Sequence, residues 1–519
     1  MLDLARLFFF AASMCPTIAL VGGGLPPDRI GAAFAVAALS GVMLCALPPA
    51  GFCAARLLAV IVSPLSLLWI AYVCLDGMGP TPLDALNTLA NTDIKEALSA
   101  VRLLANGKSI SIGLLYGVLL AASYVCGRPR PSRHSSAVVA ASLVLLMVNA
   151  WIPRLLAGAP SFLPGRDDLQ NFPFGAMADM ISELADERSL VRMRASAATK
   201  RRVPNEAPVL QSIDAIFVVG ESHRYVRPLD FTYGGPGWGL LNERVQAGLG
   251  VWLPKICASA DNTATSVPML LSGTSPEHSL DVASAPSGLA RLAAAGYETA
   301  WISNQTNIFF DDERRDLVWV AKGYTREYDE TLLSVAAVFL NRDDRRNKAL
   351  VIHMMDSHAP YTDRYPAMTE PDGIDPERRE ALQYQRANDH TLAVLARISS
   401  MLDALAKPAF AVYVPDHGEN LLADHNALHY HFSTRTSVKA GYVPSIVFWN
   451  NAFLRAFDPN GRLRPLLAAS SLAHADIYRV WMNLAGLQDR ITVTVDPKIL
   501  GKETLTSESG PISCGDLLP

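Results

Sequence analysis

The stretch AIFVVGES, residues 215–222, decides how the second half of the chain folds. Its apolar, β-branched run is typical of a buried strand, and it ends at a glycine followed by Glu221. In open α/β sheets, ligands bind beyond the carboxyl ends of the strands. Glu221 therefore stands where a functional side chain is expected.

Further runs of the same kind follow along the chain and alternate with helical stretches. The amphipathic pattern over residues 386–407 predicts a helix. The other runs predicted to be buried strands are YETAWIS (297–303), ALVIHMM (349–355), FAVYVP (410–415) and SIVFW (445–449). This alternation predicts an α/β domain with a mostly parallel central sheet over residues 211–519.

Acidic and imidazole side chains follow three of the predicted strands. Asp416 and His417 come directly after the strand at 410–415, as Glu221 does after the first strand, and the strand at 349–355 leads to Asp356 and His358. Zinc is bound in proteins by carboxylate oxygens and imidazole nitrogens, so Glu221, Asp416 and His417 are candidate metal ligands. Each has a simpler interpretation when taken alone, as an acid at a helix N-terminus or as a polar loop pair.

A cluster of hydroxyl residues lies in DNTATSVPMLLSG, residues 261–273. If the Thr263 oxygen shared the metal site, the cation would favour its alkoxide and turn a weak nucleophile into a reactive one. The cluster also suits a helix N-cap, with Thr265 or Ser266 capping a helix that begins near Val267. The two interpretations are compatible, because a helix N-terminus also favours an anionic phosphate.

The first 157 residues differ in composition from the rest. Five apolar runs, at roughly 4–24, 30–50, 55–76, 109–127 and 136–157, approach the length of about 20 residues that crosses a bilayer. They predict an α-helical membrane domain over residues 1–157, although the first run alone also suits a signal peptide. Residues 158–210 are expected to form a bridging segment, either an interfacial amphipathic helix or a solvated linker.

The distribution of arginines predicts the orientation of this domain. Arg6, Arg56 and the loop with Arg128, Arg130 and Arg133 fall on one side of the predicted spans, which is therefore expected to be cytoplasmic. With five spans, everything after residue 157 lies on the other side, which is the periplasm in a bacterium. The net charge of −4 argues against a nucleic-acid partner.

The chain has seven cysteines, and only Cys257 and Cys514 lie in the predicted α/β domain. These two could form a disulfide in an oxidising compartment, but spacing alone does not pair them.

The motifs VVGES (218–222), TATSVP (263–268), SHAP (357–360) and DHGEN (416–420) together resemble those of the bacterial inner-membrane phosphoethanolamine transferases. The resemblance implies five membrane helices and a periplasmic domain like those of alkaline phosphatases and sulfatases. By position it implies Glu221, Thr263, Asp416 and His417 as ligands of one tight zinc site, with a second left open. It also makes Thr263 the nucleophile.

The same resemblance assigns substrate contacts by position. It places His358 and His429 at the substrate as phosphate-binding or acid–base groups, and His353 as a further contact. Asn304 and Gln305 fall where such enzymes place substrate-binding amides. His429 matches the motif better than its neighbours His425 and His431.

The implied reaction transfers phosphoethanolamine from phosphatidylethanolamine to lipid A, a core sugar or another envelope glycan, through a covalent threonine intermediate. The chain departs from lipid A-directed members, because Ser259 and Met269 stand where those carry bracketing cysteines, and Ala359 replaces a glycine. The acceptor and the oligomeric state therefore stay open. A phosphoglycerol transferase or hydrolase of the same superfamily and a non-catalytic membrane scaffold are the alternatives.

Overall fold

A computed structural model of the chain divides it into two compact units, Met1–Leu190 and Val191–Pro519, which are described separately below. The structure describes residues 4–22, 42, 44–61, 107–125, 203, 205–225, 234–305, 316–320, 328–342, 346–371, 373–424, 437–458, 463–468, 472–487, 504–507 and 510–514.

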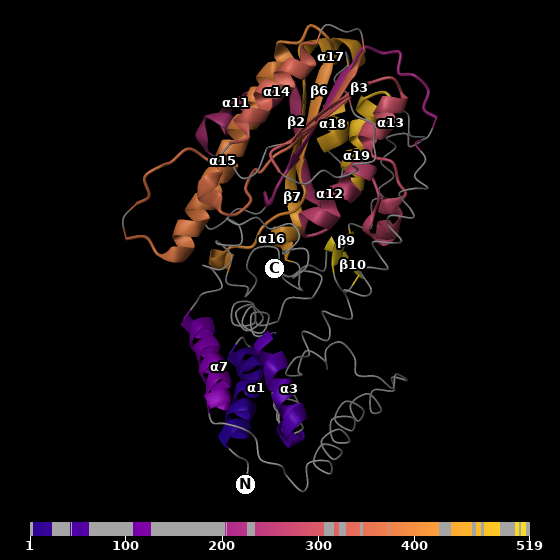
Figure 1. Cartoon of the computed structure of the whole chain (residues 1–519). Helices are drawn as coiled ribbons and strands as arrows, with labels where there is room; N and C mark the ends of the chain where they lie inside the picture. Colours follow the sequence, from indigo (N-terminus) through magenta and orange to yellow (C-terminus); the bar gives the residue numbers. More distant parts are fainter. Residues whose placement is uncertain are drawn as a thin grey trace. The chain divides into compact units, whose positions relative to one another are not determined.

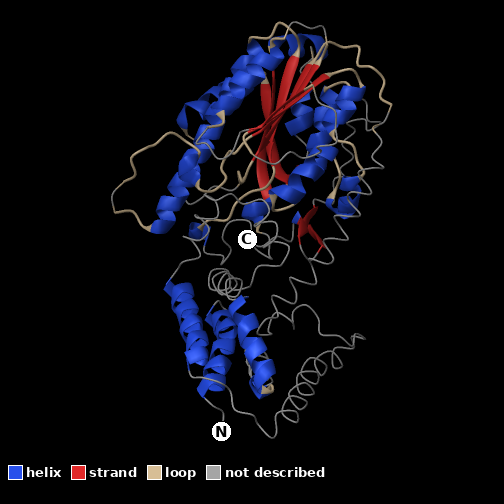
Figure 2. Cartoon of the chain, viewed as in Figure 1, coloured by secondary structure: helices blue, strands red, loops and turns tan. Residues whose placement is uncertain are grey.

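The second unit is built on an eight-stranded sheet with the order β4-β3-β5-β1-β6-β7-β2-β8 (Figures 1 and 2). Its strands are β1 (Asp214–Gly220), β2 (Gly250–Cys257), β3 (Glu298–Ser303), β4 (Leu317–Val320), β5 (Lys348–His353), β6 (Ala409–Pro415), β7 (Tyr442–Trp449) and β8 (Leu472–Ala473). The five strands from β4 to β6 run parallel, and β7 is antiparallel to both of its neighbours. The predicted mostly parallel sheet is thus confirmed.

The central strand β1 is buried on both faces because its side chains alternate between two cores. Phe217 and Val219 belong to the core of one face, and Ile216 and Val218 to that of the other. The first core includes residues of α12 (Thr263–Ser272), α13 (Gly288–Ala294) and α19 (His474–Leu484). The second includes residues of α11 (Gly235–Gln246), α14 (Glu330–Leu340) and α15 (Pro376–Asp403). The sheet is therefore the middle of three layers, and β1 delivers Glu221 from its centre.

The elements predicted from sequence differ from the observed ones mainly at their ends. The strand predicted over 349–355 ends at His353, and the helix predicted to begin at residue 386 begins at Pro376. Asp375 caps that helix by accepting a hydrogen bond from the Arg378 amide at 2.9 Å, with Pro376 in the first turn. The remaining short elements are η1 (Pro276–Ala283), η2 (Tyr361–Asp363), η3 (Leu422–Asp424), α16 (Val438–Gly441), α17 (Asn451–Phe457) and α18 (Leu463–Ala468).

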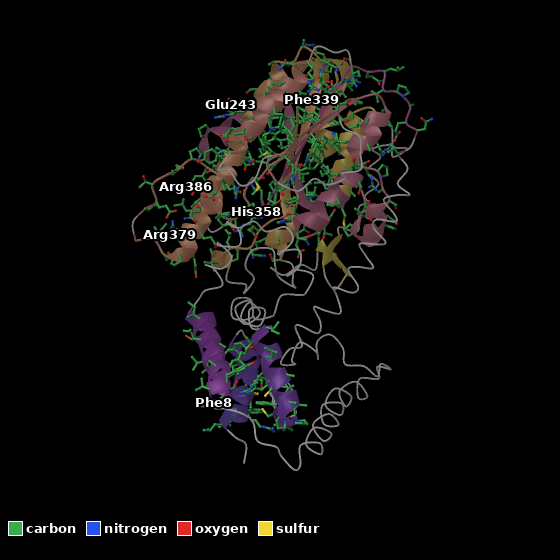
Figure 3. The ribbon with its side chains drawn as sticks, in the orientation of Figure 1. Phe8, Glu243, Phe339, His358, Arg379 and Arg386 are labelled. Atoms are coloured by element: carbon green, nitrogen blue, oxygen red, sulfur yellow. A yellow bond between two sulfur atoms is a disulfide. The ribbon has the colours of Figure 1, made fainter. Side chains whose placement is uncertain are left out.

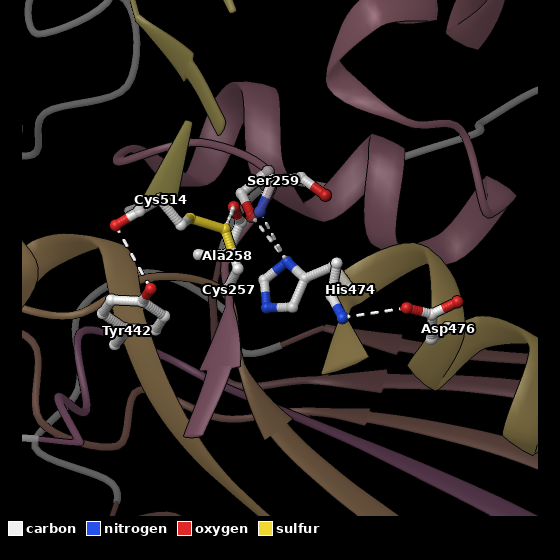
Figure 4. The surroundings of a disulfide bond; sticks show 9 residues. Cys257, Ala258, Ser259, Tyr442, His474, Asp476 and Cys514 are labelled. Atoms are coloured by element: carbon white, nitrogen blue, oxygen red, sulfur yellow. Dashed lines mark hydrogen bonds between the residues drawn. A yellow bond between two sulfur atoms is a disulfide. The ribbon is translucent and has the colours of Figure 1, made fainter. Parts of the chain in front are cut away.

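A disulfide joins Cys257, at the end of β2, to Cys514 (Figure 4). Cys514 follows the hairpin of β9 (Thr504–Ser507) and β10 (Gly510–Ser513). The Tyr442 hydroxyl donates to the Cys514 carbonyl oxygen at 3.1 Å and packs with both cysteines in a small buried cluster. The pairing that spacing left open is therefore present.

The first unit contains α1 (Leu4–Gly22), α3 (Pro49–Ile61) and α7 (Gly107–Val125). These helices share a small core in which the rings of Phe9 and Phe52 meet edge to face at 5.3 Å. α1 and α7 coincide with the first and fourth predicted apolar runs. α3 begins at the end of the second predicted run and covers only residues 55–61 of the third, whose remainder lies outside the described residues. The second and fifth runs fall mostly or wholly outside the described residues, as does most of the predicted bridging segment 158–210.

Among the helices in the described part of the chain, none meets the combined requirement of length and apolar character for a membrane span. The five-span membrane domain stays a prediction.

Candidate metal centre and nucleophile

Glu221, Asp416 and His417 converge at the carboxyl ends of β1 and β6. One ligand atom from each lies within 4.8 Å of the others, and all three side chains are fully buried. His417 Nε2 is 3.2 Å from Glu221 Oε1 and 3.5 Å from Asp416 Oδ2. The side chains come together because β1 and β6 pair in parallel with Gly220 opposite Pro415, so both strands end at the same level.

Two glycines of the motifs are needed for this convergence. A Cβ built on Gly220 would lie 2.3 Å from Asp356 Oδ2, and one built on Gly418 would lie 2.0 Å from the Lys439 carbonyl oxygen. Neither approach is compatible with a larger residue. The glycine of VVGE therefore lets the Asp356 and Tyr413 side chains approach the chain beside Glu221, and the glycine of DHGE lets the Lys439 backbone approach the chain beside His417.

Backbone contacts hold the candidate ligands in place. Asp416 Oδ1 accepts hydrogen bonds from the amides of His417 at 2.8 Å and Ser222 at 3.3 Å. Ser222 has a positive φ of 58°, which turns the chain after Glu221 so that its amide faces Asp416. His417 Nδ1 lies 2.8 Å from the Gly418 carbonyl oxygen, so it carries the ring proton and donates. This leaves Nε2 as the atom directed at the carboxylates.

Thr263 is the first residue of α12 and its hydroxyl lies against the cluster. Oγ1 is 3.1 and 3.0 Å from the two Glu221 carboxylate oxygens and 3.3 Å from His417 Nε2. The helix begins earlier than the sequence interpretation placed it. Neither Thr265 nor Ser266 is the cap, because the Asn262 side chain accepts the Thr265 amide at 3.0 Å.

The protonation of the cluster reflects its burial and its concentrated negative charge. Burial, followed by the charge of Glu221, raises the pKa of Asp416 well above its usual range. Burial by itself lowers the pKa of His417, but the charges of Asp416 and Glu221 outweigh it and raise that pKa to about 10. The cluster is therefore a site that attracts positive charge.

The cluster fits a divalent metal ion. In the described part of the chain, Asp416 Oδ2 has no hydrogen-bond partner although it is buried, which a polar atom tolerates poorly. Two carboxylates, one imidazole and a hydroxyl make up a donor set that suits zinc, and the orientation of His417 is already fixed by Gly418. Glu221, Asp416 and His417, together with Thr263, are the residues that could hold the ion.

The two predicted substrate amides lie just beyond β3 and contact the protein. Gln305 Nε2 donates to Glu221 Oε2 at 3.0 Å and to the Met354 carbonyl oxygen at 2.8 Å. Asn304 Nδ2 donates to Asp329 Oδ1 at 2.9 Å. Gln305 thus orients a candidate ligand, and the role of both amides as substrate contacts stays a prediction.

The predicted histidines are placed differently from one another. His353 is the last residue of β5 and is fully buried, with Nδ1 3.2 Å from Ser303 Oγ. Burial lowers the pKa of His353 to about 4, so its ring is neutral. His358 is partly exposed and is labelled in Figure 3; its Nδ1 donates to the Ala359 carbonyl oxygen at 2.5 Å. That bond leaves Nε2 as the basic nitrogen of His358.

His429, His425 and His431 lie outside the described residues, so their predicted roles stay untested. Within the described residues, the Glu221–Asp416–His417 group is the one set of three acidic, histidine or cysteine side chains close enough to share an ion. The number of metal ions that the chain binds stays open.

Asp356 supports the site, although no specific role was predicted for it. Its backbone has a positive φ of 41°, and its carboxylate accepts the Tyr413 hydroxyl at 2.6 Å and the Glu221 amide at 3.3 Å. Asp329 in turn accepts the Asp356 amide at 2.8 Å. The position of Asp356 after a predicted strand was a signal, but its partners come from distant segments that only the folded chain brings together.

Comparisons with known proteins were made for the sequence and for the fold. The family model described as Sulfatase matches residues 214–487, slightly more than half of the chain. The phosphoethanolamine transferase EptC of Escherichia coli K12 is 26% identical over 223 residues, which are 39% of this chain and 38% of that protein. The aligned regions of the curated relatives thus span less than two fifths of their own lengths.

Two solved structures share the fold. The integral membrane lipooligosaccharide phosphoethanolamine transferase A (EptA) from Neisseria meningitidis has a TM-score of 0.67 at 17% identity, covering 93% of this chain and 94% of its own. The C-terminal periplasmic domain of EptC from E. coli has a TM-score of 0.51 at 19% identity, covering 61% of this chain and 98% of its own.

Proposed function

Because the chain belongs to the sulfatase family, we propose that it transfers phosphoethanolamine from phosphatidylethanolamine to a glycolipid or glycan of the bacterial cell envelope. The similarity to EptC confirms the resemblance to phosphoethanolamine transferases that the motifs indicated. The observation that carries the proposal is the Thr263 hydroxyl, which lies within 3.3 Å of both Glu221 and His417 at a buried cluster of metal-ligand type.

In the proposed reaction, Thr263 Oγ1 attacks the phosphorus of the donor lipid. The new P–O bond to threonine forms as the P–O bond to diacylglycerol breaks, and diacylglycerol leaves with a proton. An acceptor hydroxyl then attacks the same phosphorus and restores the free threonine. Splitting the transfer into two displacements is the general advantage of a covalent intermediate.

The residues of the site have distinct tasks in this scheme. Glu221 accepts the hydrogen bond from Thr263, and Gln305 fixes that carboxylate by donating to its other oxygen. The His417 ring is oriented by its bond to Gly418. A zinc ion held by Glu221, Asp416 and His417 would supply Lewis-acid polarisation.

Proton transfer is proposed for His358 and His429. A partly exposed imidazole whose Nδ1 proton is held by a carbonyl, as in His358, has the basic Nε2 that a general base needs. The leaving diacylglycerol alkoxide requires a proton, and the acceptor hydroxyl must lose one. His358 and His429 are proposed to share these two steps.

The first unit is proposed to embed the chain in the bacterial inner membrane, with the catalytic unit in the periplasm. One face of α7 supports this, because Ile110, Leu114 and Val118 follow one another at intervals of four residues and are 47%, 64% and 64% exposed. An exposed apolar stripe of this kind is stabilised by contact with lipid. The Cys257–Cys514 disulfide suits an oxidising compartment such as the periplasm.

The experiment that tests the function uses the full-length protein in micelles that contain phosphatidylethanolamine labelled in its headgroup. A transferase releases diacylglycerol and moves the label to an added envelope glycolipid such as lipid A or core oligosaccharide. A hydrolase releases diacylglycerol but leaves the label as free phosphoethanolamine. That result would overturn the proposed transfer and identify the protein as a hydrolase. If the zinc-loaded protein releases no diacylglycerol, both the transferase and the hydrolase activity are refuted.

A further inference from the structure

His474 is a fully buried histidine that the proposed reaction does not use. It is the first residue of α19 and lies beside the segment that leads into the Thr263 helix. Figure 4 shows its ring directed at Ser259, close to the end of β2. Its two ring nitrogens contact two different parts of the site.

The hydrogen bonds fix the tautomer of the ring. The Ser259 amide donates to Nδ1 at 3.0 Å, so Nδ1 has no proton. The proton is therefore on Nε2, which donates to the Pro415 carbonyl oxygen at 3.0 Å. Burial lowers the pKa of His474 to about 3, and the neutral ring can keep both bonds at neutral pH.

These bonds join the two segments that carry the chemistry. Pro415 immediately precedes Asp416, and Ser259 lies four residues before Thr263. Ser266, one turn into α12, adds a second tie, because its hydroxyl donates to the Asp416 carbonyl oxygen at 2.6 Å and lies 3.3 Å from His474 Nδ1.

We propose that His474 is a positioning residue that fixes the distance between the nucleophile segment, residues 259–266, and the Asp416–His417 loop. The inference rests on the proposed function for the attacking role of Thr263. Without the Nδ1 acceptor, the Ser259 amide is buried and unpaired, and the segment shifts to satisfy it. A shift of about 1 Å at the attacking oxygen lowers turnover by about 10²-fold.

Two variants separate the two bonds. His474→Asn places an amide oxygen near the position of Nδ1, so it keeps the acceptor for Ser259 and loses the bond to Pro415. His474→Gln places an amide nitrogen near the position of Nε2, so it keeps the bond to Pro415 and loses the acceptor. Because each variant loses one neutral hydrogen bond, a merely structural role predicts equal losses of stability and of activity.

The measurements are diacylglycerol release from labelled phosphatidylethanolamine by the full-length protein, zinc content, and amide hydrogen exchange of the peptide containing Ser259. We expect His474→Gln to lower kcat by about 10²-fold with KM and zinc content within about twofold of the wild type. We expect His474→Asn to retain kcat within about threefold. Exchange at Ser259 should rise in His474→Gln and not in His474→Asn.

Equal kcat in the two variants, or a loss of zinc in His474→Gln, would overturn the inference. A wild-type protein that releases no diacylglycerol would instead refute the proposed function. In that case the exchange of the Ser259 amide still decides whether His474 holds the nucleophile segment.

Discussion

Thr263 Oγ1 lies 3.1 and 3.0 Å from the two carboxylate oxygens of Glu221, a residue 42 positions earlier in the chain. The hydroxyl is thus held at the centre of the candidate metal site by a carboxylate at the end of the central strand. The proposed chemistry therefore depends on the position of Thr263 Oγ1.

Replacing Thr263 with alanine should lower transfer by more than about 10³-fold and abolish the covalent intermediate, because no other group takes over the attack. The measurement is mass spectrometry of the peptide containing residue 263 after incubation with donor lipid. Thr265→Ala is the matched control, since it removes the same atoms from the same helix and the Thr265 contact to Asn262 uses only its backbone amide. A fully active Thr263→Ala enzyme would show that the nucleophile lies elsewhere.

Removing zinc with a chelator should abolish transfer, and added Zn²⁺ should restore it. Binding should also raise Tm, because a ligand at about 1,000 times its Kd stabilises the folded state by about 4 kcal/mol. We expect Asp416→Asn to lose most of this increase, since Asp416 lies in the buried cluster, whereas Glu330→Gln removes an acid on α14 and should keep it. A zinc-dependent rise in Tm that is unchanged in Asp416→Asn would place the metal at another site.

Asn262→Ala should lower both stability and turnover. The lost N-cap costs about 0.5–2 kcal/mol, and the freed first turn of α12 carries Thr263. Asp375→Ala removes an equivalent cap from α15 and should lower stability by a similar amount while leaving kcat unchanged. Comparing Tm and kcat in the two variants separates the lost stability of a cap from the misplacement of Thr263. Equal kcat in both variants would show that Thr263 keeps its position when α12 has no N-cap.

His353 should make stability depend on pH below neutrality. The pKa of about 4 that His353 has in the folded chain lies below the usual 6.5 of a histidine, so the unfolded chain binds more protons between these values. The contribution of the neutral ring is complete above pH 6.5 and is lost as pH falls towards 4, at about 1.4 kcal/mol per pH unit.

Denaturant titrations at several pH values check this prediction. We expect His353→Asn to have a shallower dependence on pH, because asparagine has no proton to gain. His278→Asn is the control, since His278 is an exposed residue whose ring contacts Ser275 near the surface. A slope unchanged in His353→Asn would show that other groups dominate the acid response.

The sequence predicted the parts of the fold that depend on local patterns. Apolar runs of five to seven residues marked β1, β3, β5, β6 and β7, and the polar residues after them located Glu221, Asp416 and His417. It missed β2, whose run GVWLPKIC contains a proline and a lysine, and the four-residue β4. These strands are defined by their partners in the sheet, which a local pattern does not contain.

The contacts that orient the site were less accessible to sequence reasoning. Gln305 was expected to touch substrate, and both donors of its side-chain amide are directed at protein oxygens. His474 carried no signal, because a single histidine after a short apolar pair is compatible with many environments. These side chains pair with residues 84 and 59 positions away in the chain, and only the assembled sheet brings them together.

The bond between Cys257 and Cys514 closes a covalent ring with a consequence for biosynthesis. Thr263, Asp416 and His417 lie inside the ring, whereas Glu221 precedes it. Since β10 is made after every strand of the main sheet, the ribosome must have passed all of them before the ring can be sealed. Oxidation can therefore close the ring around Thr263, Asp416 and His417 only after the hairpin of β9 and β10 has been synthesised.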